Sequence, residues 1–409
     1  MAKGLVSDTN LTAIANAIRA KNGSSDTYTP ATMATAITNI PTSQVDETTA
    51  LQYMLNNKTD YTGIAAGLTS LTQLPTFTQP DGIMEFTQAF RGCSALTSAS
   101  GIQFTGFTGS GSTFRNLTVT GMFRGCTNLT TPPTKGEGRY KLANLSYAFY
   151  GCRSLTSLDI GEFNIGGDGS NAFYNCQELT DIAGPNNLKF NGYAQSTNLS
   201  QMFYNCYALE KVLFTYSGDS TGYIGSSSNG CNFGSTFYNC TALEKICGSD
   251  SPVKLALYPT NLSGMFRGCT SLTGIKGLEI YRATNFAGGI SMTNMFNGCS
   301  SLTTMNINTA RYTVSPSSIN SAFKGCTNLT TFSIPDLSAV TGTGLQNAFQ
   351  DCPSLSNTSL NNILAALATS AVTSNKTLKY IGLSSDQATT CTGLSNWSAL
   401  SAAGWTTGY

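Results

Sequence analysis

Histidine is absent from the 409 residues of the chain. Its absence excludes Ser-His-Asp and Cys-His catalysis and every metal site that depends on histidine ligands. The phosphate-binding loop G-x-x-x-x-G-K-[ST] is also missing, as is a dinucleotide fingerprint between a strand and a helix. We therefore expect no enzymatic activity, no cofactor and no metal. A pair of carboxylates, as in glycosidases, stays open in principle, but sequence alone cannot select one pair among 21 acidic residues.

Charge is also scarce. Charged residues make up 11% of the chain and leave a net charge of +1, whereas about a quarter is usual. This composition gives no electrostatic reason to expect nucleic acid or an anionic membrane as a partner. No apolar run approaches the length of a transmembrane helix, and the first eight residues lack the apolar stretch of a signal peptide. We expect neither membrane insertion nor secretion by a signal of its own.

Cysteine is plentiful, with 13 residues, yet the C-x-x-C spacing typical of zinc sites does not occur. The chain is also too long to be a small disulfide scaffold. Ten cysteines occupy equivalent positions of a repeat, and Cys231, Cys247 and Cys391 do not. Repeats stacked about 4.8 Å apart would bring successive cysteines within disulfide range. We interpret the ten as a buried ladder of free thiols, because each occupies the same inward position.

The repeat is the phrase F-x-x-C-x-x-L, which occurs ten times at spacings of 24 to 34 residues. A period of this size predicts a solenoid, in which each repeat buries its apolar face against its neighbours. The structural positions of four copies are Phe90, Cys93, Leu96, Phe123, Cys126, Leu129, Phe149, Cys152, Leu155, Phe203, Cys206 and Leu209. The other copies begin at Phe173, Phe237, Phe266, Phe296, Phe323 and Phe349.

Within each copy, the residue before the cysteine is Gly, Asn or Asp. These residues tolerate positive φ, so we expect a left-handed residue that closes a short helical turn carrying the Phe. The leucine opens a segment L-x-x-aliphatic, as in Leu155–Leu158, and the alternation at 305–308 indicates a short strand. The predicted fold class is an α/β repeat solenoid with a parallel sheet along one side.

This phrase resembles the BspA-type leucine-rich repeat, with its signature A-F-x-x-C-x-x-L-x-x-I, over residues 85–357. The resemblance implies a leucine-rich-repeat solenoid used for binding, and it implies no enzymatic activity. The irregular spacing departs from the family pattern. We expect the insertions 136–144 and 216–230 to form loops or lengthened edges.

We predict three regions. Residues 1–45 form a two-helix docking module, with apolar faces at 11–18 and 33–40 and a stop at Pro41. This module is too small to be stable alone. Residues 46–357 form the leucine-rich-repeat solenoid, with an N-terminal cap at 68–75. Residues 358–409 form a C-terminal cap with a helix at 360–367, a strand at 378–383 and a helix through Cys391. The two tryptophans near the end complete the cap or, alternatively, form an aromatic binding site.

Both ends resemble tailed-bacteriophage proteins. The segment LTAIANAIRAKNGSSDTYTPATMATAI is similar to the start of many phage structural proteins, and W-x-x-L-x-x-x-G-W-T-T-G-Y is similar to the tail of phage-encoded repeat proteins. The resemblance implies a tail-fibre, head-fibre or baseplate-associated protein of the virion, assembled in the host cytoplasm. It implies contacts to other virion proteins through residues 1–41, a homo-oligomer, and attachment to a host-surface glycan or protein. The alternatives are a capsid decoration or spacer protein without a receptor, a cellular BspA-type surface adhesin, and an enzyme that degrades surface polysaccharide.

Two rows of side chains are candidate binding surfaces. Stacking aligns the residues that follow each Phe, so Tyr150, Tyr174, Tyr204 and Tyr238 form a stripe with arginine at each end. The stripe is either amphipathic cover over the edge of the coils or an aromatic contact surface for a glycan or protein. Because few charges lie nearby, we expect such an affinity to depend weakly on salt. The second row lies on the predicted strands and is otherwise a solvated polar face; it contains Ser157, Asp181, Lys211, Lys245, Gly274, Thr304 and Thr331.

Overall fold

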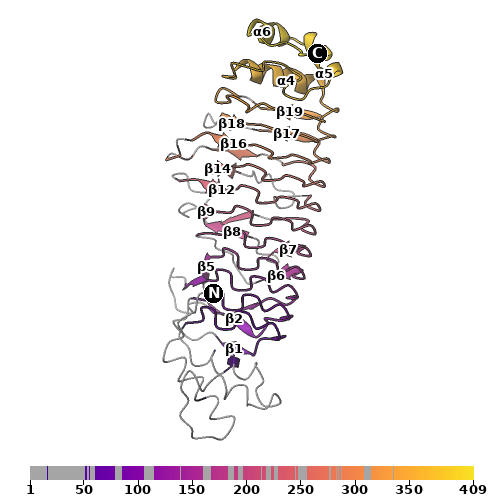
Figure 1. Cartoon of the computed structure of the whole chain (residues 1–409). Coiled ribbons are helices and arrows are strands. Elements are labelled where there is room, and N and C mark those ends of the chain that lie inside the picture. The colour runs from indigo at the N-terminus through magenta and orange to yellow at the C-terminus, as the bar shows by residue number, and fades with distance from the viewer. Residues whose placement is uncertain are drawn as a thin grey trace, which may run out of the picture.

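The structure is a computed structural model of the whole chain. It describes residues 16, 51–52, 55, 60–78, 85–105, 115–138, 140–159, 167–182, 188–191, 197–212, 214–217, 223–224, 229–244, 246, 256–275, 278–281, 283, 285–286, 288–307, 315–334 and 336–409. Figure 1 shows an elongated stack of coils that runs from β1 (Phe77–Thr78) to the helices that follow the last repeat. The repeat solenoid predicted from the sequence is therefore present. The predicted two-helix module at 1–45 lies outside the described residues, apart from residue 16.

Each coil contains a tight turn segment centred on its Phe. In all ten copies the second residue before the Phe and the second residue after it have positive φ, as in Gln88 (54°) and Gly92 (77°) of the first copy. The predicted left-handed residue before the cysteine is confirmed. The predicted short helical turn is wrong, because left-handed residues on both sides of the Phe convert the segment into consecutive tight turns.

The backbone N–H groups of this turn segment alternate between two kinds of hydrogen bond. Phe203 and Asn205 donate to carbonyl oxygens of the next coil, both at 2.8 Å, whereas Tyr204 donates back to Gln201 at 3.3 Å. The same alternation recurs from coil to coil along the solenoid. The local bonds close each turn, and the bonds between coils tie the turns together, so this edge is a continuous ladder.

A polar side chain opens most of these turn segments. The residue five positions before the Phe is Asn, Asp or Ser in seven of the ten copies, and its side-chain oxygen accepts a hydrogen bond from the N–H two residues later. Asn144 and Asp168, for example, accept from Ser146 and Ser170 at 3.0 and 2.9 Å. Such Asx and Ser turns favour a change of chain direction, which sends the chain from a strand into the turn.

The strands are short and all the paired ones run parallel. Instead of one continuous sheet along one side, they form several sheets of two or three strands. The strands are β1, β2 (Ile102–Phe104), β3 (Arg115–Thr118), β4 (Thr134–Lys135), β5 (Tyr140–Asn144), β6 (Ser157–Leu158), β7 (Asp181–Ile182), β8 (Leu188–Asn191), β9 (Thr197–Asn198), β10 (Phe214–Ser217), β11 (Tyr223–Ile224), β12 (Cys231–Asn232), β13 (Ala256–Leu257), β14 (Pro259–Asn261), β15 (Glu279–Ile280), β16 (Ile290–Ser291), β17 (Thr304–Asn306), β18 (Pro316–Ser318) and β19 (Thr331–Ser333).

These strands occupy two main places in the coils. The pairs β6–β7 and β17–β19 follow the leucine of the repeat, where strands were predicted. The sets β3–β5, β9–β12–β14 and β16–β18 lie just before the turn segment, where no strand was predicted. The described coils therefore share a turn edge, with a strand before it in some coils and after the leucine in others.

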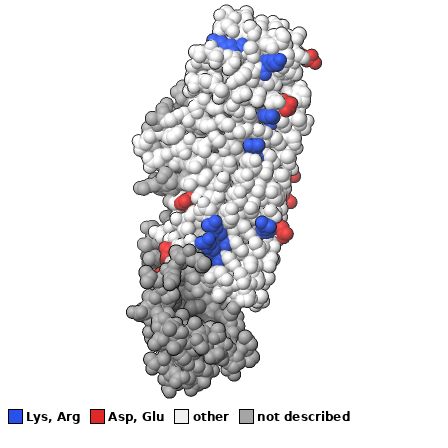
Figure 2. Space-filling view, in the orientation of Figure 1, with Lys and Arg blue, Asp and Glu red and all other residues white. Residues whose placement is uncertain are grey.

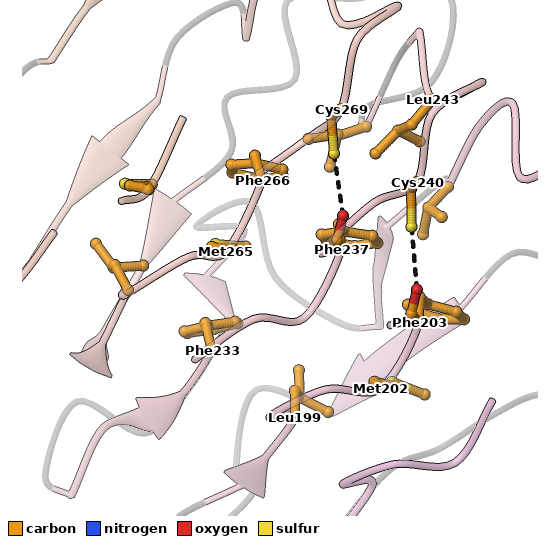
Figure 3. Packing of buried hydrophobic residues seen from close by; sticks show 14 of the residues in the cluster. Leu199, Met202, Phe203, Phe233, Phe237, Cys240, Leu243, Met265, Phe266 and Cys269 are labelled. Atoms are coloured by element: carbon orange, nitrogen blue, oxygen red, sulfur yellow. Dashed lines mark hydrogen bonds between the residues drawn. The ribbon is translucent and has the colours of Figure 1, made fainter. Parts of the chain in front are cut away.

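The repeat side chains form parallel columns inside the stack. The ten Phe rings stack in one continuous column, with neighbouring centroids 5.3 to 5.6 Å apart. The Phe and Cys side chains are at most 2% exposed, and the leucines at most 7%. Figure 3 shows Phe203, Phe237 and Phe266 beside Cys240, Cys269 and Leu243 in this interior. Burial of each large apolar side chain contributes about 1.5–3 kcal/mol, so neighbouring coils stabilise one another.

The first described coil is a degenerate repeat. Gly63 and Gly67 have positive φ, Ala65 occupies the position of the Phe, and Leu68 occupies that of the cysteine. Its N–H groups bond to the next coil in the usual alternation. Ala65 has no ring, so the Phe column ends at this coil. The predicted cap at 68–75 is the later part of the same coil, which begins at Tyr61.

The C-terminal end is covered by helices α4 (Asn357–Ala368), α5 (Ser385–Thr392) and α6 (Trp397–Ala402). Ser356 caps α4 and Ser384 caps α5 with a capping box. The predicted strand at 378–383 is instead a turn, because Tyr380 and Ile381 present their carbonyl oxygens to N–H groups of the last repeat. No helix among the described residues has the length and apolar character needed to cross a membrane.

Candidate binding surface

The residues that follow the ten Phe form one row along the turn edge, and we call them the turn row. They alternate with buried neighbours, because the Phe points into the core while the next residue points away from it. The turn row contains Arg91, Arg124, Tyr150, Tyr174, Tyr204, Tyr238, Arg267, Asn297, Lys324 and Gln350. All of them except the exposed Arg91 are partly buried.

The four tyrosines form a stacked column in the middle of the turn row. The ring centroids of Tyr150 and Tyr174 lie 4.7 Å apart, those of Tyr174 and Tyr204 lie 4.7 Å apart, and those of Tyr204 and Tyr238 lie 4.4 Å apart. The ring planes deviate by only 5° to 7°. We call these four residues the tyrosine column. Their spacing follows that of the coils, so the solenoid itself holds the rings in register.

An arginine covers each end of the tyrosine column. The guanidinium carbon of Arg124 lies 5.1 Å from the ring centroids of both Tyr147 and Tyr150, and that of Arg267 lies 5.4 Å from Tyr238. Cation–π contacts of this kind stabilise by about 0.5–1 kcal/mol at exposed sites. With neighbours on both sides, no ring of the column has a face left for stacking on a ligand. Only the ring edges and the hydroxyl ends remain for contact.

The column also changes the acidity of its hydroxyl groups. Burial, followed by the neighbouring Tyr238 and Tyr174, raises the pKa of Tyr204 to about 12. Burial, followed by Tyr150 and Tyr207, raises the pKa of Tyr174. Both hydroxyls stay protonated at physiological pH and can donate as well as accept a hydrogen bond, and the Tyr204 hydroxyl is hydrogen-bonded to Tyr238.

An asparagine ladder runs beside the tyrosine column. Asn205 donates from Nδ2 to Oδ1 of Asn175 at 2.9 Å, and Asn239 donates in the same way to Asn205 at 3.1 Å. All three have positive φ, and they stand where the other copies have Gly or Asp. The ladder stops at Gly268, where an added Cβ would lie 2.3 Å from Oδ1 of Asn239.

The second candidate row, on the strands, is a polar face tied to its own backbone. Ser157, Lys211, Thr304 and Thr331 are exposed, Asp181 and Gly274 are partly buried, and Lys245 lies outside the described residues. Threonines beside this row donate their hydroxyls to the preceding coil, as Thr303 does to Thr273 and Thr330 does to Thr303 at 3.2 and 3.1 Å. These hydroxyls are satisfied within the chain, which favours the solvated-face interpretation.

The structure brings the four tyrosines of the predicted stripe together. Most of the insertion at 216–230, expected beside the stripe, lies outside the described residues. Trp405 is buried under the C-terminal cap and Trp397 packs partly against the core, so their contacts fit a cap. Among the described residues, no group of three or more Cys, Asp or Glu is arranged to hold a metal ion.

Sequence reasoning missed two parts of this surface. Tyr147 lies beside Tyr150, with ring centroids 5.8 Å apart, because the second residue before the Phe is also on the turn edge. The asparagine ladder was treated only as a backbone requirement. Its signal was visible in three consecutive asparagines at one repeat position, since equal amides in stacked coils can bond to each other.

A comparison with protein families agrees with this architecture. A family model described as "BspA type Leucine rich repeat region" matches residues 119–228, 146–281 and 292–393. A solved leucine-rich cell surface protein from Faecalibacterium prausnitzii is 19% identical, with 64% of this chain and 78% of that chain covered and a TM-score of 0.23. The TLR13–ssRNA13 complex gives 14% identity, 76% and 48% coverage, and a TM-score of 0.24.

This chain thus spans about half of the TLR13 chain, and at these TM-scores neither solved structure bears on function. No curated protein matches the chain. The family model covers more than half of the residues, and its repeat coincides with the Phe, Cys and Leu columns of the solenoid. The chain belongs to the BspA-type leucine-rich repeat family.

Proposed function

We propose that this protein is a non-enzymatic binding protein of a tailed-bacteriophage virion, which displays its solenoid for attachment to the host surface. Residues 1–41 join it to other virion proteins, and the turn edge contacts a host-surface glycan or protein. The proposal rests on the family, on the resemblance of both chain ends to phage proteins, and on the surface of the turn edge.

The observation that carries the binding role is the tyrosine column with an arginine at each end. Tyrosine and arginine are enriched at binding hot spots, because they combine large contact area with hydrogen-bonding groups. The ladder of hydrogen bonds between coils fixes their positions before any ligand arrives. A surface that is ordered in advance loses less conformational entropy on binding.

A cellular BspA-type surface adhesin is the second candidate. Family membership favours it, since the family model describes the repeat region without reference to a virion. Both candidates use the solenoid for binding. They differ only in whether a virion or a cell surface displays the solenoid. A capsid decoration protein without a receptor would lack the binding role altogether.

Labelling on intact particles tests whether a virion or a cell displays the protein. We expect antibodies against the full chain to label phage particles at one location, tail or head, in electron micrographs. We also expect particles whose copy lacks residues 1–41 to lose the label. Labelling of the host cell envelope in uninfected cells would favour the adhesin instead.

Competition tests the binding role. Added full-length protein should reduce adsorption of the phage to its host. The double variant Tyr174→Ala and Tyr204→Ala should keep the fold by circular dichroism and compete less well, while Thr303→Ala and Thr330→Ala on the strand side should compete normally. Equal competition by both variants would remove the tyrosine column from the binding site.

A further inference from the structure

The turn row carries positive charge without a carboxylate. The turn row contains four cations and no carboxylate, namely Arg91, Arg124, Arg267 and Lys324, although the whole chain has a net charge of only +1. Two positions before the Phe, no copy has a charged residue. Two positions after the Phe, the only charged residue is Asp351, in the last copy. Figure 2 shows a few basic and acidic side chains, some of them side by side, on a face that is otherwise uncharged. A ligand approaching the turn row therefore meets cations and no carboxylate within that row.

Two of the cations are held in place by aromatic rings. Arg124 lies over Tyr147 and Tyr150, and Arg267 lies over Tyr238, at 5.1 to 5.4 Å. A guanidinium over a ring keeps its N–H donors along its own edge, where they match the paired oxygens of a carboxylate, sulfate or phosphate. Because the rings restrict the side chains beforehand, binding costs less entropy.

Hydroxyl and amide groups fill the interval between the two arginines. Five coil steps separate Arg124 from Arg267, which is roughly 24 Å at about 4.8 Å per coil. Along this interval the ring faces are covered, so the tyrosine column presents edges and hydroxyl ends, beside the amides of the asparagine ladder. This is a linear array of neutral hydrogen-bonding groups with a fixed cation at each end.

From this arrangement we infer that the turn row binds an anionic polysaccharide of the host surface. Its acidic groups pair with Arg124 and Arg267, and its hydroxyls bond to the tyrosine hydroxyls and asparagine amides between them. The inference rests on the proposed host-binding function and specifies its ligand. It also replaces the expectation of weak salt dependence, because pairs between arginine and an acidic group are screened by salt.

The covered ring faces favour a polysaccharide over a single-stranded nucleic acid. Proteins that bind single strands use aromatic faces on which bases stack. Here Tyr174 and Tyr204 have a ring on both faces, and Tyr150 and Tyr238 have a ring on one face and an arginine on the other. A sugar polymer needs hydrogen bonds and charge pairs, which the edge of the column supplies.

Binding of the full-length protein to defined polymers tests the inference. The probes are dextran sulfate, polygalacturonate, uncharged dextran of matched length and single-stranded DNA, measured by calorimetry at low and at physiological salt. We expect binding to both acidic polysaccharides, weaker binding at higher salt, and no binding to uncharged dextran. Equal or tighter binding of the DNA would overturn the preference for a sugar polymer.

Variants locate the site. Arg124→Gln with Arg267→Gln should weaken binding of polygalacturonate by roughly tenfold or more, and Tyr174→Phe with Tyr204→Phe should weaken it while keeping the stacked rings. Lys211→Gln with Lys379→Gln removes the same charge from the strand side and the C-terminal cap, and should leave the affinity unchanged.

Two results would overturn the inference: no binding of either acidic polysaccharide by the folded protein, or an equal loss in the arginine and lysine double variants. If the protein still competes with phage adsorption in that case, the proposed function stands and only the ligand is wrong. If polygalacturonate binds through the arginines but particles are not labelled, the ligand stands and the virion role fails.

Discussion

The thiol of Cys206 donates a hydrogen bond to the carbonyl oxygen of Phe173 in the preceding coil, with 3.1 Å between Sγ and oxygen. The same oxygen accepts the N–H of Cys176 at 3.1 Å. All ten repeat cysteines make this thiol bond to the preceding coil, at 2.9 to 3.2 Å. Figure 3 shows two of these bonds, from Cys240 to Phe203 and from Cys269 to Phe237. The repeat cysteine is thus a hydrogen-bond donor between coils as well as a small buried side chain.

Replacing Cys206 with alanine should therefore cost more than the loss of a buried sulfur. The change removes the donor to Phe173 and leaves a small cavity, so we expect a loss of about 2–3 kcal/mol in the free energy of unfolding. Cys391→Ala is the control, since this buried thiol lies in the C-terminal cap outside the ladder. Urea unfolding measures both, and an equal loss would show that the thiol bond contributes nothing.

The thiol ladder also predicts instability in alkali. Burial raises the pKa of Cys206 and Cys240 well above the ordinary 9.0, and that of Cys352 to about 12. The folded state therefore holds protons that the unfolded state releases above pH 9, so stability is complete below pH 9 and falls as the pH rises. Each such thiol contributes a slope of about 1.4 kcal/mol per pH unit.

Urea unfolding between about pH 8 and pH 11 measures this slope. The raised pKa of Tyr204, about 12 against 10.0, adds a further loss between those two values. The variant Cys206→Ala with Cys240→Ala should show a shallower slope above pH 9 than the parent. A slope that does not change would mean that these thiols ionise equally in the folded and unfolded states.

Neighbouring aromatic residues of one coil should differ in their contribution to stability. Phe203 is fully buried between Phe173 and Phe237, with centroids 5.3 and 5.4 Å away, so Phe203→Ala should cost about 3–5 kcal/mol. Tyr204→Ala should cost clearly less, because this ring is partly exposed and loses mainly its stacking contacts. Thermal and urea unfolding compare the two, and equal losses would contradict the assignment of the inner and outer columns.

Gly268 should resist substitution because of the asparagine ladder. Its φ of 75° disfavours any side chain, and an added Cβ would lie 2.3 Å from Oδ1 of Asn239. Gly125→Ala has a similar φ of 80°, but its Cβ would meet only backbone atoms of Gly92 at 3.8 and 3.9 Å, so it is the matched control. We expect the larger destabilisation at Gly268 and a partial rescue when Asn239→Gly is added. Equal effects at both glycines would mean that only the backbone conformation matters.

The repeat phrase predicted much of this architecture, because Phe, Cys and Leu recur at one fixed spacing. That spacing defines which side chains are equivalent, and stacked equivalents form columns. The alignment of Tyr150 with Tyr174 followed from this logic alone. The helical turn at the Phe was predicted wrongly, because Gln88 and Tyr147 carry no obvious sign of positive φ, whereas Gly92 does. The strands before the Phe were missed because segments such as Thr197–Asn198 are too short and polar to show alternation.

The sequence by itself determined the repeat, the family and the order of residues along each column, since these depend only on spacing and residue type. Only the tertiary structure decided what each column does. The tyrosine ring centroids lie 4.4 to 4.7 Å apart, so the rings cover one another's faces. Only the ring edges and the hydroxyl groups are left for contact with a ligand. Likewise, the thiol of Cys206 donates a hydrogen bond because the preceding coil places the carbonyl oxygen of Phe173 3.1 Å from its sulfur. Both outcomes depend on the distance between coils, which no single repeat contains.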